Sequence, residues 1–168
     1  SGAYDKQEQL KAMRIAAQAV IRLAERHAEH ARSLAEQEAD PQRRAELEQI
    51  AAVCAHVPAH APRNFWEALQ YYWFVHLGVT IELNPWDAFN PGHLDHHLDP
   101  FYQRGLEDGS LTREKAEELL QCFWIKFNNQ PAPPKVGITA EESNTYTDFA
   151  QINTGGVKPD GSDAVNDV

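Results

Sequence analysis

Two segments of this chain are too apolar to stand as surface helices. The first opens at Asn64, with Glu67 three residues later as the second half of a capping box, and it carries apolar side chains on every face as far as residue 81. The second follows a capping Thr112 and continues through Phe127 with a similar excess of large apolar residues. Polar residues inside the first segment argue against a membrane span, so other protein must cover it. We expect more apolar surface than the rest of this sequence can bury.

Composition limits the class of protein and its partners. The chain has 168 residues, of which 42% are hydrophobic, which suits one folded domain with a true core. Its formal net charge of -10 disfavours nucleic acid and anionic membranes as partners. Cys54 and Cys122 lie in predicted helices without a disulfide or metal-finger spacing, and no signal-peptide pattern is visible. We therefore predict buried thiols at both positions and a cytoplasmic location.

Residues 1–57 predict an antiparallel helical hairpin. One apolar stripe with three-then-four spacing follows a long first helix. The stripe consists of Leu10, Met13, Ala17, Val20, Ala24, His27, Ala31 and Leu34. Asp40 followed by Pro41 predicts the cap and first turn of a second helix. Its inward-facing residues are predicted to be Leu47, Ile50, Ala51 and Cys54. The extended connector that begins at residue 57 separates this hairpin from the second expected domain, residues 58–168.

The second domain is predicted to combine the buried helices with loops and little sheet. Residues 84–92 and 128–134 are proline-containing loops, each after an apolar helix. Residues 146–153 alternate polar and apolar side chains as a strand does, and residues 136–138 are a doubtful second strand. Ser162 is expected to cap a short helix at the C-terminal end. The predicted class is therefore mainly α with one or two short strands, whose sheet neighbours must lie outside this sequence.

A cluster of histidines and carboxylates offers the most visible candidate metal site. His93, His96 and His97 alternate with Asp95 and Asp99 where a loop gives way to a short helix. Imidazole and carboxylate suit zinc and other divalent ions. No second ligand group stands at a recognised spacing, however, and adjacent histidines diverge on a helix. A polar, solvent-facing turn is the favoured interpretation, and we predict no metal.

Familiar catalytic motifs are missing from the sequence. It contains no Gly-x-Ser-x-Gly elbow and no glycine-rich phosphate loop. Neither cysteine has a nearby basic partner or helix N-terminus that would lower its pKa. We predict no self-contained catalytic residue in these 168 residues.

Four runs of residues carry a resemblance to a known family. Residues 65–77, 94–102, 123–129 and 148–156 resemble the middle of a glycyl radical enzyme of the pyruvate formate-lyase family, and the similarity covers almost the whole chain. The resemblance is greatest to the branch of glycerol and diol dehydratases, choline trimethylamine-lyase and sulfonate lyases. Residues 82–87 and 130–134 favour the sulfonate-lyase side.

This resemblance implies a much longer parent chain, folded as a ten-stranded α/β barrel. Such enzymes serve anaerobic metabolism, are expected to be homodimers, and carry an organic radical on a glycine loop that acts through a cysteine loop. A separate iron–sulfur activating enzyme installs the radical with S-adenosylmethionine. The Cys-x-Glu and Arg-Val-x-Gly-Tyr-like motifs of these loops are absent here, and neither Cys54 nor Cys122 matches the catalytic position. The chain alone is therefore expected to be inert and to hold no bound cofactor.

The resemblance also suggests substrate-binding residues on the predicted strand. Phe149 matches the position of a pocket aromatic in the family. Isethionate cleavage uses a tryptophan there, so phenylalanine implies another substrate within the branch. Gln151 and Asn153 project to the same side by period-two alternation and suit amide contacts with a polar substrate. The alternatives are that Phe149 belongs to the barrel core and that the two amides satisfy barrel backbone.

Three interpretations of function stay open at this point. The first is an internal piece of a radical carbon–heteroatom lyase or dehydratase that acts on a small polar molecule, with the rest of the parent chain and the activating enzyme as partners. The second is a piece of formate C-acetyltransferase, which requires adjacent cysteines in the missing loop. The third is a non-catalytic helical module that binds a protein through its aromatic helices. A reading frame that continues past Val168 into a Cys-x-Glu loop would favour the enzymes.

Overall fold

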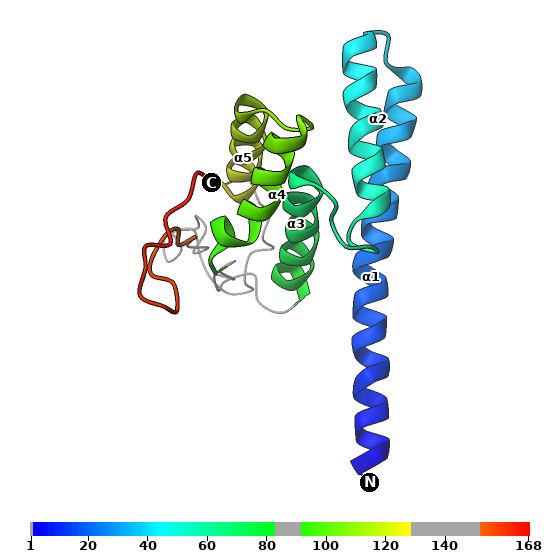
Figure 1. Ribbon diagram of the computed structural model, residues 1–168. Coiled ribbons are helices and arrows are strands. Elements are labelled where there is room, and N and C mark those ends of the chain that lie inside the picture. Colours follow the sequence, from blue (N-terminus) through cyan, green and yellow to red (C-terminus); the bar gives the residue numbers. More distant parts are fainter. Residues whose placement is uncertain (1, 83–91, 129–151) are drawn as a thin grey trace, which may run out of the picture. The chain divides into compact units, whose positions relative to one another are not determined.

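The computed structural model describes residues 2–82, 92–128 and 152–168. Five helices occur there, in the order α1 Gly2–Gln37, α2 Pro41–His56, α3 Phe65–Glu82, α4 Leu94–Asp108 and α5 Arg113–Asn128 (Figure 1). Within these ranges β pairing is limited to the isolated bridges His93–Asn153 and Val157–Asp163. The mainly helical prediction is confirmed for this part of the chain. Two compact units, Ser1–Pro62 and Arg63–Val168, divide it, and each is described by itself.

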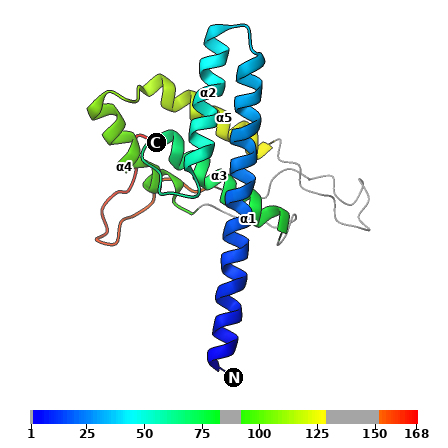
Figure 2. The ribbon, with the colours of Figure 1, turned by 90° about the vertical axis from the view of Figure 1, so that its right-hand side faces the viewer.

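Unit 1 contains an antiparallel hairpin of α1 and α2. Helix α1 has 36 residues and α2 has 16, so at about 1.5 Å per residue α2 can return along only the C-terminal half of α1 (Figures 1 and 2). The predicted cap of α2 is confirmed, because Asp40 Oδ1 accepts a hydrogen bond from the Gln42 N–H at 2.8 Å. Pro41 occupies the first turn, where its missing N–H leaves no helical bond unmade.

Alanine forms the buried face of α1, which corrects part of the predicted stripe. The buried residues are Ala24, Ala28, Ala31 and Ala35 on α1, and Leu47, Ala51, Val53 and Cys54 on α2. Leu10 and Met13 are 65% and 62% exposed because they lie on the half of α1 that α2 does not reach. Leu34 is also 42% exposed, since the smaller Ala31 and Ala35 take the inner face and let the helices approach closely. His27 is exposed and bonds through Nδ1 to the Leu23 carbonyl oxygen at 2.8 Å.

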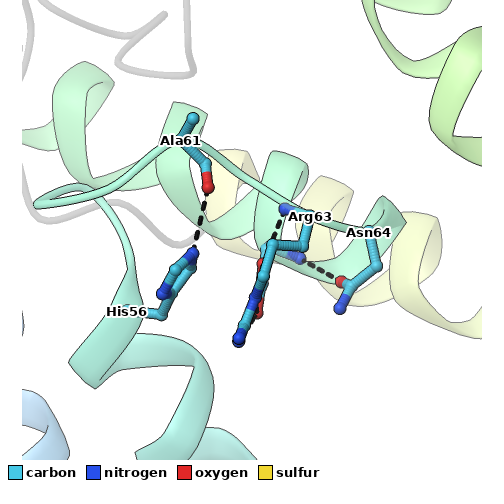
Figure 3. Close-up of polar contacts among 5 residues, drawn as sticks. His56, Ala61, Arg63 and Asn64 are labelled. Carbon is cyan, nitrogen blue, oxygen red and sulfur yellow. Dashed lines mark hydrogen bonds and ion pairs between the residues drawn. The ribbon is translucent and has the colours of Figure 1, made fainter.

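The predicted domain boundary after residue 57 stays a prediction. Unit 1 extends as far as Pro62. His56, in the last turn of α2, joins this extension to the hairpin, because its Nε2 lies 3.0 Å from the carbonyl oxygen of Ala61 (Figure 3).

The start of α3 uses the predicted capping residues in a slightly shifted way. Asn64 Oδ1 accepts a hydrogen bond from the Glu67 N–H at 2.9 Å, as a capping box requires. The Glu67 carboxylate, however, accepts from the Arg63 N–H at 2.7 Å and from Arg63 Nε at 3.1 Å (Figure 3). This ion pair raises the pKa of Arg63. Because Glu67 is only 2% exposed, the guanidinium supplies the counter-charge that a buried carboxylate needs.

Unit 2 packs α3, α4 and α5 around one apolar core. Its buried members are Phe65, Leu69 and Trp73 from α3, Leu94, Leu98 and Tyr102 from α4, and Leu111, Ala116, Leu119 and Phe123 from α5 and the preceding turn. Gly105 allows the close return of the chain after α4, since a Cβ there would lie 2.7 Å from Leu111 Cβ. The predicted cap of α5 is confirmed by a 3.1 Å hydrogen bond from the Lys115 N–H to Thr112 Oγ1.

Large apolar residues remain on the surface of the two apolar helices. Val75 and Ile81 on α3 are 39% and 46% exposed, and Trp124 and Ile125 on α5 are 45% and 58% exposed. The expectation of uncovered apolar surface is thus confirmed at these positions. None of the described helices combines the length and apolar character that crossing a membrane requires.

The predicted helix at the C-terminal end is wrong. Residues 162–168 contain no helical turn. Asx-type bonds take up the backbone instead, from the Val165 N–H to Asp163 Oδ1 and from the Val168 N–H to Asn166 Oδ1, each at 2.9 Å. A turn precedes these residues, in which the Gly161 N–H donates to the Lys158 carbonyl oxygen at 2.9 Å.

Candidate functional site

The three predicted substrate-binding residues fall at the edge of what the structure describes. Phe149 and Gln151 lie outside the described residues. Asn153 is exposed, and its backbone pairs with His93, just before α4, in an isolated parallel bridge. Its role in substrate binding stays a prediction.

A buried carboxylate next to this bridge joins segments that are distant in sequence. Asp95 lies in the first turn of α4 and is 3% exposed. Its Oδ2 accepts a hydrogen bond from the Gly155 N–H at 2.7 Å and another from Asn166 Nδ2 at 3.3 Å. Asp95 therefore holds the start of α4, the segment after Asn153 and the C-terminal residues together.

Two glycines make this contact possible. Gly155 and Gly156 have φ angles of +69° and +93°, which residues with a Cβ rarely adopt. A Cβ on Gly155 would also lie 3.0 Å from Val165 Cγ2. The Gly156 carbonyl oxygen in turn accepts a hydrogen bond from the Ala164 N–H at 3.1 Å. The glycine pair lets the backbone turn toward Asp95 and pack against residues 164 and 165.

Of the predicted histidine and carboxylate cluster, three members come together. The possible ligand atoms of His93, Asp95 and His96 lie within 4.8 Å of one another. The two imidazole rings stack with centroids 4.9 Å apart and planes 7° apart. His96 Nε2 also lies 2.9 Å from the Ala164 carbonyl oxygen, a hydrogen-bond contact that an ion at this nitrogen would have to displace.

The other two members of the cluster, His97 and Asp99, do not take part in this arrangement. His97 is exposed, and Asp99 Oδ1 accepts a hydrogen bond from Gln103 Nε2 at 3.0 Å. The arrangement suits a polar junction better than a preformed metal centre, and the absence of a metal stays a prediction.

Asp95 is held in its charged form. Burial alone would raise its pKa, because desolvation penalises the carboxylate. Hydrogen bonds from the backbone N–H groups of Gly155 and His96, together with the charge of His96, outweigh burial and place the pKa below its ordinary value of 3.8. Its Oδ1 is buried and has no hydrogen-bond partner among the described residues. A charge in this position stabilises the junction only while the donors on Oδ2 stay in place.

Acid should therefore loosen the junction. The charged form stabilises the folded state, so the contribution of Asp95 is complete above pH 3.8 and is lost as the pH falls through its lower folded pKa. Hydrogen exchange of residues 152–156 should be faster in Asp95→Asn than in the parent protein near neutral pH. The ratio of the two rates should approach one as the pH falls below 3.8. A ratio that stays constant down to pH 3 would show that Asp95 does not act as a charge.

A second surface feature is an apolar groove on unit 2. It is lined by Trp66, Leu69, Gln70 and Trp73 of α3 and by Leu119, Cys122, Phe123 and Lys126 of α5. Lys126 Nζ lies 5.2 Å from the centre of the Trp73 ring, a cation–π contact. Cys122 is exposed, contrary to the prediction, whereas Cys54 is buried as predicted. These linings suit apolar side chains of a polypeptide more than a small polar substrate.

Comparison with known proteins decides the family. The family model described as pyruvate formate lyase-like matches residues 1–168. The chain belongs to the pyruvate formate lyase-like family. It is 60% identical over 166 residues to trans-4-hydroxy-L-proline dehydratase of Clostridioides difficile, and this match covers 99% of the chain and 21% of the relative. It is 36% identical over 167 residues to isethionate sulfite-lyase of Desulfovibrio desulfuricans, covering 98% of the chain and 20% of the relative.

A solved structure of the family shows the same backbone. The crystal structure of hydroxyproline dehydratase from Clostridioides difficile, with its substrate trans-4-hydroxy-L-proline bound, matches with a TM-score of 0.89 and 59% identity. The match covers 98% of this chain and 21% of that one. The chain thus spans about one fifth of the length of these relatives.

These matches confirm the resemblance found in the sequence and adjust its finer part. The prediction of a pyruvate formate-lyase-like glycyl radical enzyme segment is confirmed, and so is a fold that forms part of that barrel. The preference for the sulfonate-lyase side gains no support, because identity to the dehydratase is 60% and to the sulfite-lyase 36%. The role of Asp95 was missed, and the only signal for it was the glycine pair at residues 155–156.

Proposed function

We propose that these 168 residues are a segment of a longer glycyl radical dehydratase that acts on a small polar substrate in the cytoplasm. The observation that carries this proposal is the 60% identity to trans-4-hydroxy-L-proline dehydratase across 99% of the chain. That identity makes trans-4-hydroxy-L-proline the first substrate to test. The segment is inactive alone, and its partners are the rest of the parent chain and the radical-activating enzyme.

The surface of unit 2 supports a segment rather than a free-standing enzyme. The exposed Trp124 and Ile125 on α5 and the apolar groove lined by α3 and α5 are features that further polypeptide would cover. The chain also spans about one fifth of the relatives that it matches. Both observations agree with the expectation of an incomplete chain, which rested on its two apolar helices.

The radical chemistry itself has no fitting residues in this segment. In the proposed parent enzyme, a glycyl radical would supply the means to remove a hydrogen atom from the substrate. Cys54 is buried within α2, Cys122 lies on α5, and neither is followed by the Cys-x-Glu pattern. What the segment contributes under this proposal is part of the pocket wall, through Phe149, Gln151 and Asn153.

The direct test uses the complete reading frame that contains this segment. The full-length protein, activated without oxygen by its activating enzyme, should remove water from trans-4-hydroxy-L-proline and should not release sulfite from isethionate. The 168-residue chain, treated in the same way, should be inactive with both. Turnover of isethionate but not of hydroxyproline, or turnover of neither, would contradict the proposed dehydratase.

The proposed pocket wall has its own test. Replacing Phe149 with alanine in the full-length protein should change the ratio of kcat/KM between competing substrates by roughly tenfold or more, because an enlarged pocket discriminates less. The radical content, measured by electron paramagnetic resonance, should stay at the parent level. An unchanged substrate profile would assign Phe149 to the barrel core instead.

A further inference from the structure

We propose that Asp95 is a positioning residue, whose buried carboxylate fixes the backbone at residues 153–155 and so orients Asn153 toward the substrate. The inference rests on the proposed function, since it takes Asn153 as part of the pocket wall. Asp95 itself touches no substrate in this account. It acts through the backbone of the segment that follows the predicted strand.

The start of α4 contacts residues 153–155 at two points. His93, just before the helix, pairs with Asn153 in a parallel bridge. Asp95, two residues later, accepts the Gly155 N–H at 2.7 Å. Because the two contacts flank Thr154, the backbone on both sides of it is tied to one rigid element. A side chain at position 153 can then keep one direction.

The chemistry of the second contact makes it the stronger of the two. A short hydrogen bond to a carboxylate that is 3% exposed is charge-assisted and shielded from water. The segment that it holds contains two adjacent glycines with positive φ, a type of backbone with many alternative conformations. Without the carboxylate, the other described backbone contacts of this segment, the His93–Asn153 bridge and the bond from the Ala164 N–H to the Gly156 carbonyl oxygen, lie on either side of Gly155 and not at it.

The same carboxylate also has a purely structural partner. Asn166 Nδ2 donates to Asp95 Oδ2 at 3.3 Å and connects the C-terminal residues to α4. A loss of stability in an Asp95 variant would therefore fit either role. Only a change in substrate binding at constant radical content separates positioning from support of the fold.

The experiment compares variants of the full-length, activated protein with trans-4-hydroxy-L-proline as the substrate. Asp95→Ala removes the acceptor, and Asp95→Asn keeps the shape without the charge, which provides a milder variant if the first folds poorly. Asp99→Asn is the matched control, because it is the same substitution on the same helix, at a residue bonded only locally to Gln103 among the described contacts. The readouts are KM, kcat, radical content and hydrogen exchange of residues 152–156.

The expected result is a rise in KM of about tenfold for Asp95→Ala, roughly the worth of one hydrogen bond between Asn153 and the substrate, with radical content unchanged. Asp95→Asn should lie between this variant and the parent, and exchange of residues 152–156 should quicken in both. Asp99→Asn should match the parent. An unchanged KM in folded Asp95 variants would overturn the inference, as would a loss confined to radical content.

Failure of the proposed function would be visible separately. If the parent protein turned over no hydroxyproline, the dehydratase proposal would fall, and exchange at residues 152–156 would still judge the anchoring by Asp95. Faster exchange in the Asp95 variants alone would support that anchoring, and equal exchange in all variants would refute it.

Discussion

Replacing Phe123 with alanine is expected to lower the free energy of opening of α3 and α5 by about 3–5 kcal/mol, the usual cost of removing a buried aromatic ring. Phe123 is 4% exposed and belongs to the unit 2 core. Its ring meets those of Tyr72 and Trp73 edge to face, with centroids 5.8 and 6.4 Å away. The residues around the resulting cavity cannot move in to fill it, because they belong to rigid helices.

Hydrogen exchange of α3 and α5 peptides in the full-length protein would measure this change. Gln121→Ala on the same helix is the control, since Gln121 is exposed and bonds only locally to Glu117 among the described contacts. The control should stay within about 0.5 kcal/mol of the parent. An equally small effect of Phe123→Ala would mean that α3 and α5 do not pack as described.

Replacing Ala28 with leucine is expected to destabilise the hairpin by about 1–3 kcal/mol through overpacking. Ala28 is 1% exposed and lies on the alanine face that α1 turns toward α2. A larger side chain there must push the helices apart or adopt a strained rotamer. Exchange of α1 and α2 peptides in the full-length protein should quicken accordingly.

The matched control for this variant is Ala52→Leu, the same substitution at an exposed position of α2. It should change the free energy of opening by less than about 0.5 kcal/mol. If Ala28→Leu were as mild as the control, the close alanine contact between α1 and α2 would be wrong.

Signals between neighbouring residues predicted the helices well. Asp40 with Pro41, and Thr112 before α5, cap their helices through side-chain bonds that span two or three residues. Such bonds depend on local sequence alone, so a pattern can reveal them. The same reasoning failed after Ser162, where the side chains of Asp163 and Asn166 accept hydrogen bonds from the backbone N–H groups two residues later, in Asx turns that compete with a helix.

Packing partners were harder to foresee. The stripe on α1 gave weight to large residues such as Leu10 and Met13, whereas the actual contact depends on small alanines and on the short length of α2. The candidate site posed the same difficulty, because Asp95 and Gly155 are 60 positions apart. The spacing of neighbouring residues along the sequence cannot reveal a contact over that distance. The glycine pair indicated a special backbone but not the carboxylate that it meets.

The central claim is that these residues belong to a longer radical enzyme, and electron paramagnetic resonance tests it most directly. After anaerobic incubation with the activating enzyme and S-adenosylmethionine, the full-length protein should show the signal of a protein-based organic radical, and the 168-residue chain should show none. A full-length protein that gives no such signal under conditions that activate a known glycyl radical dehydratase would contradict the account.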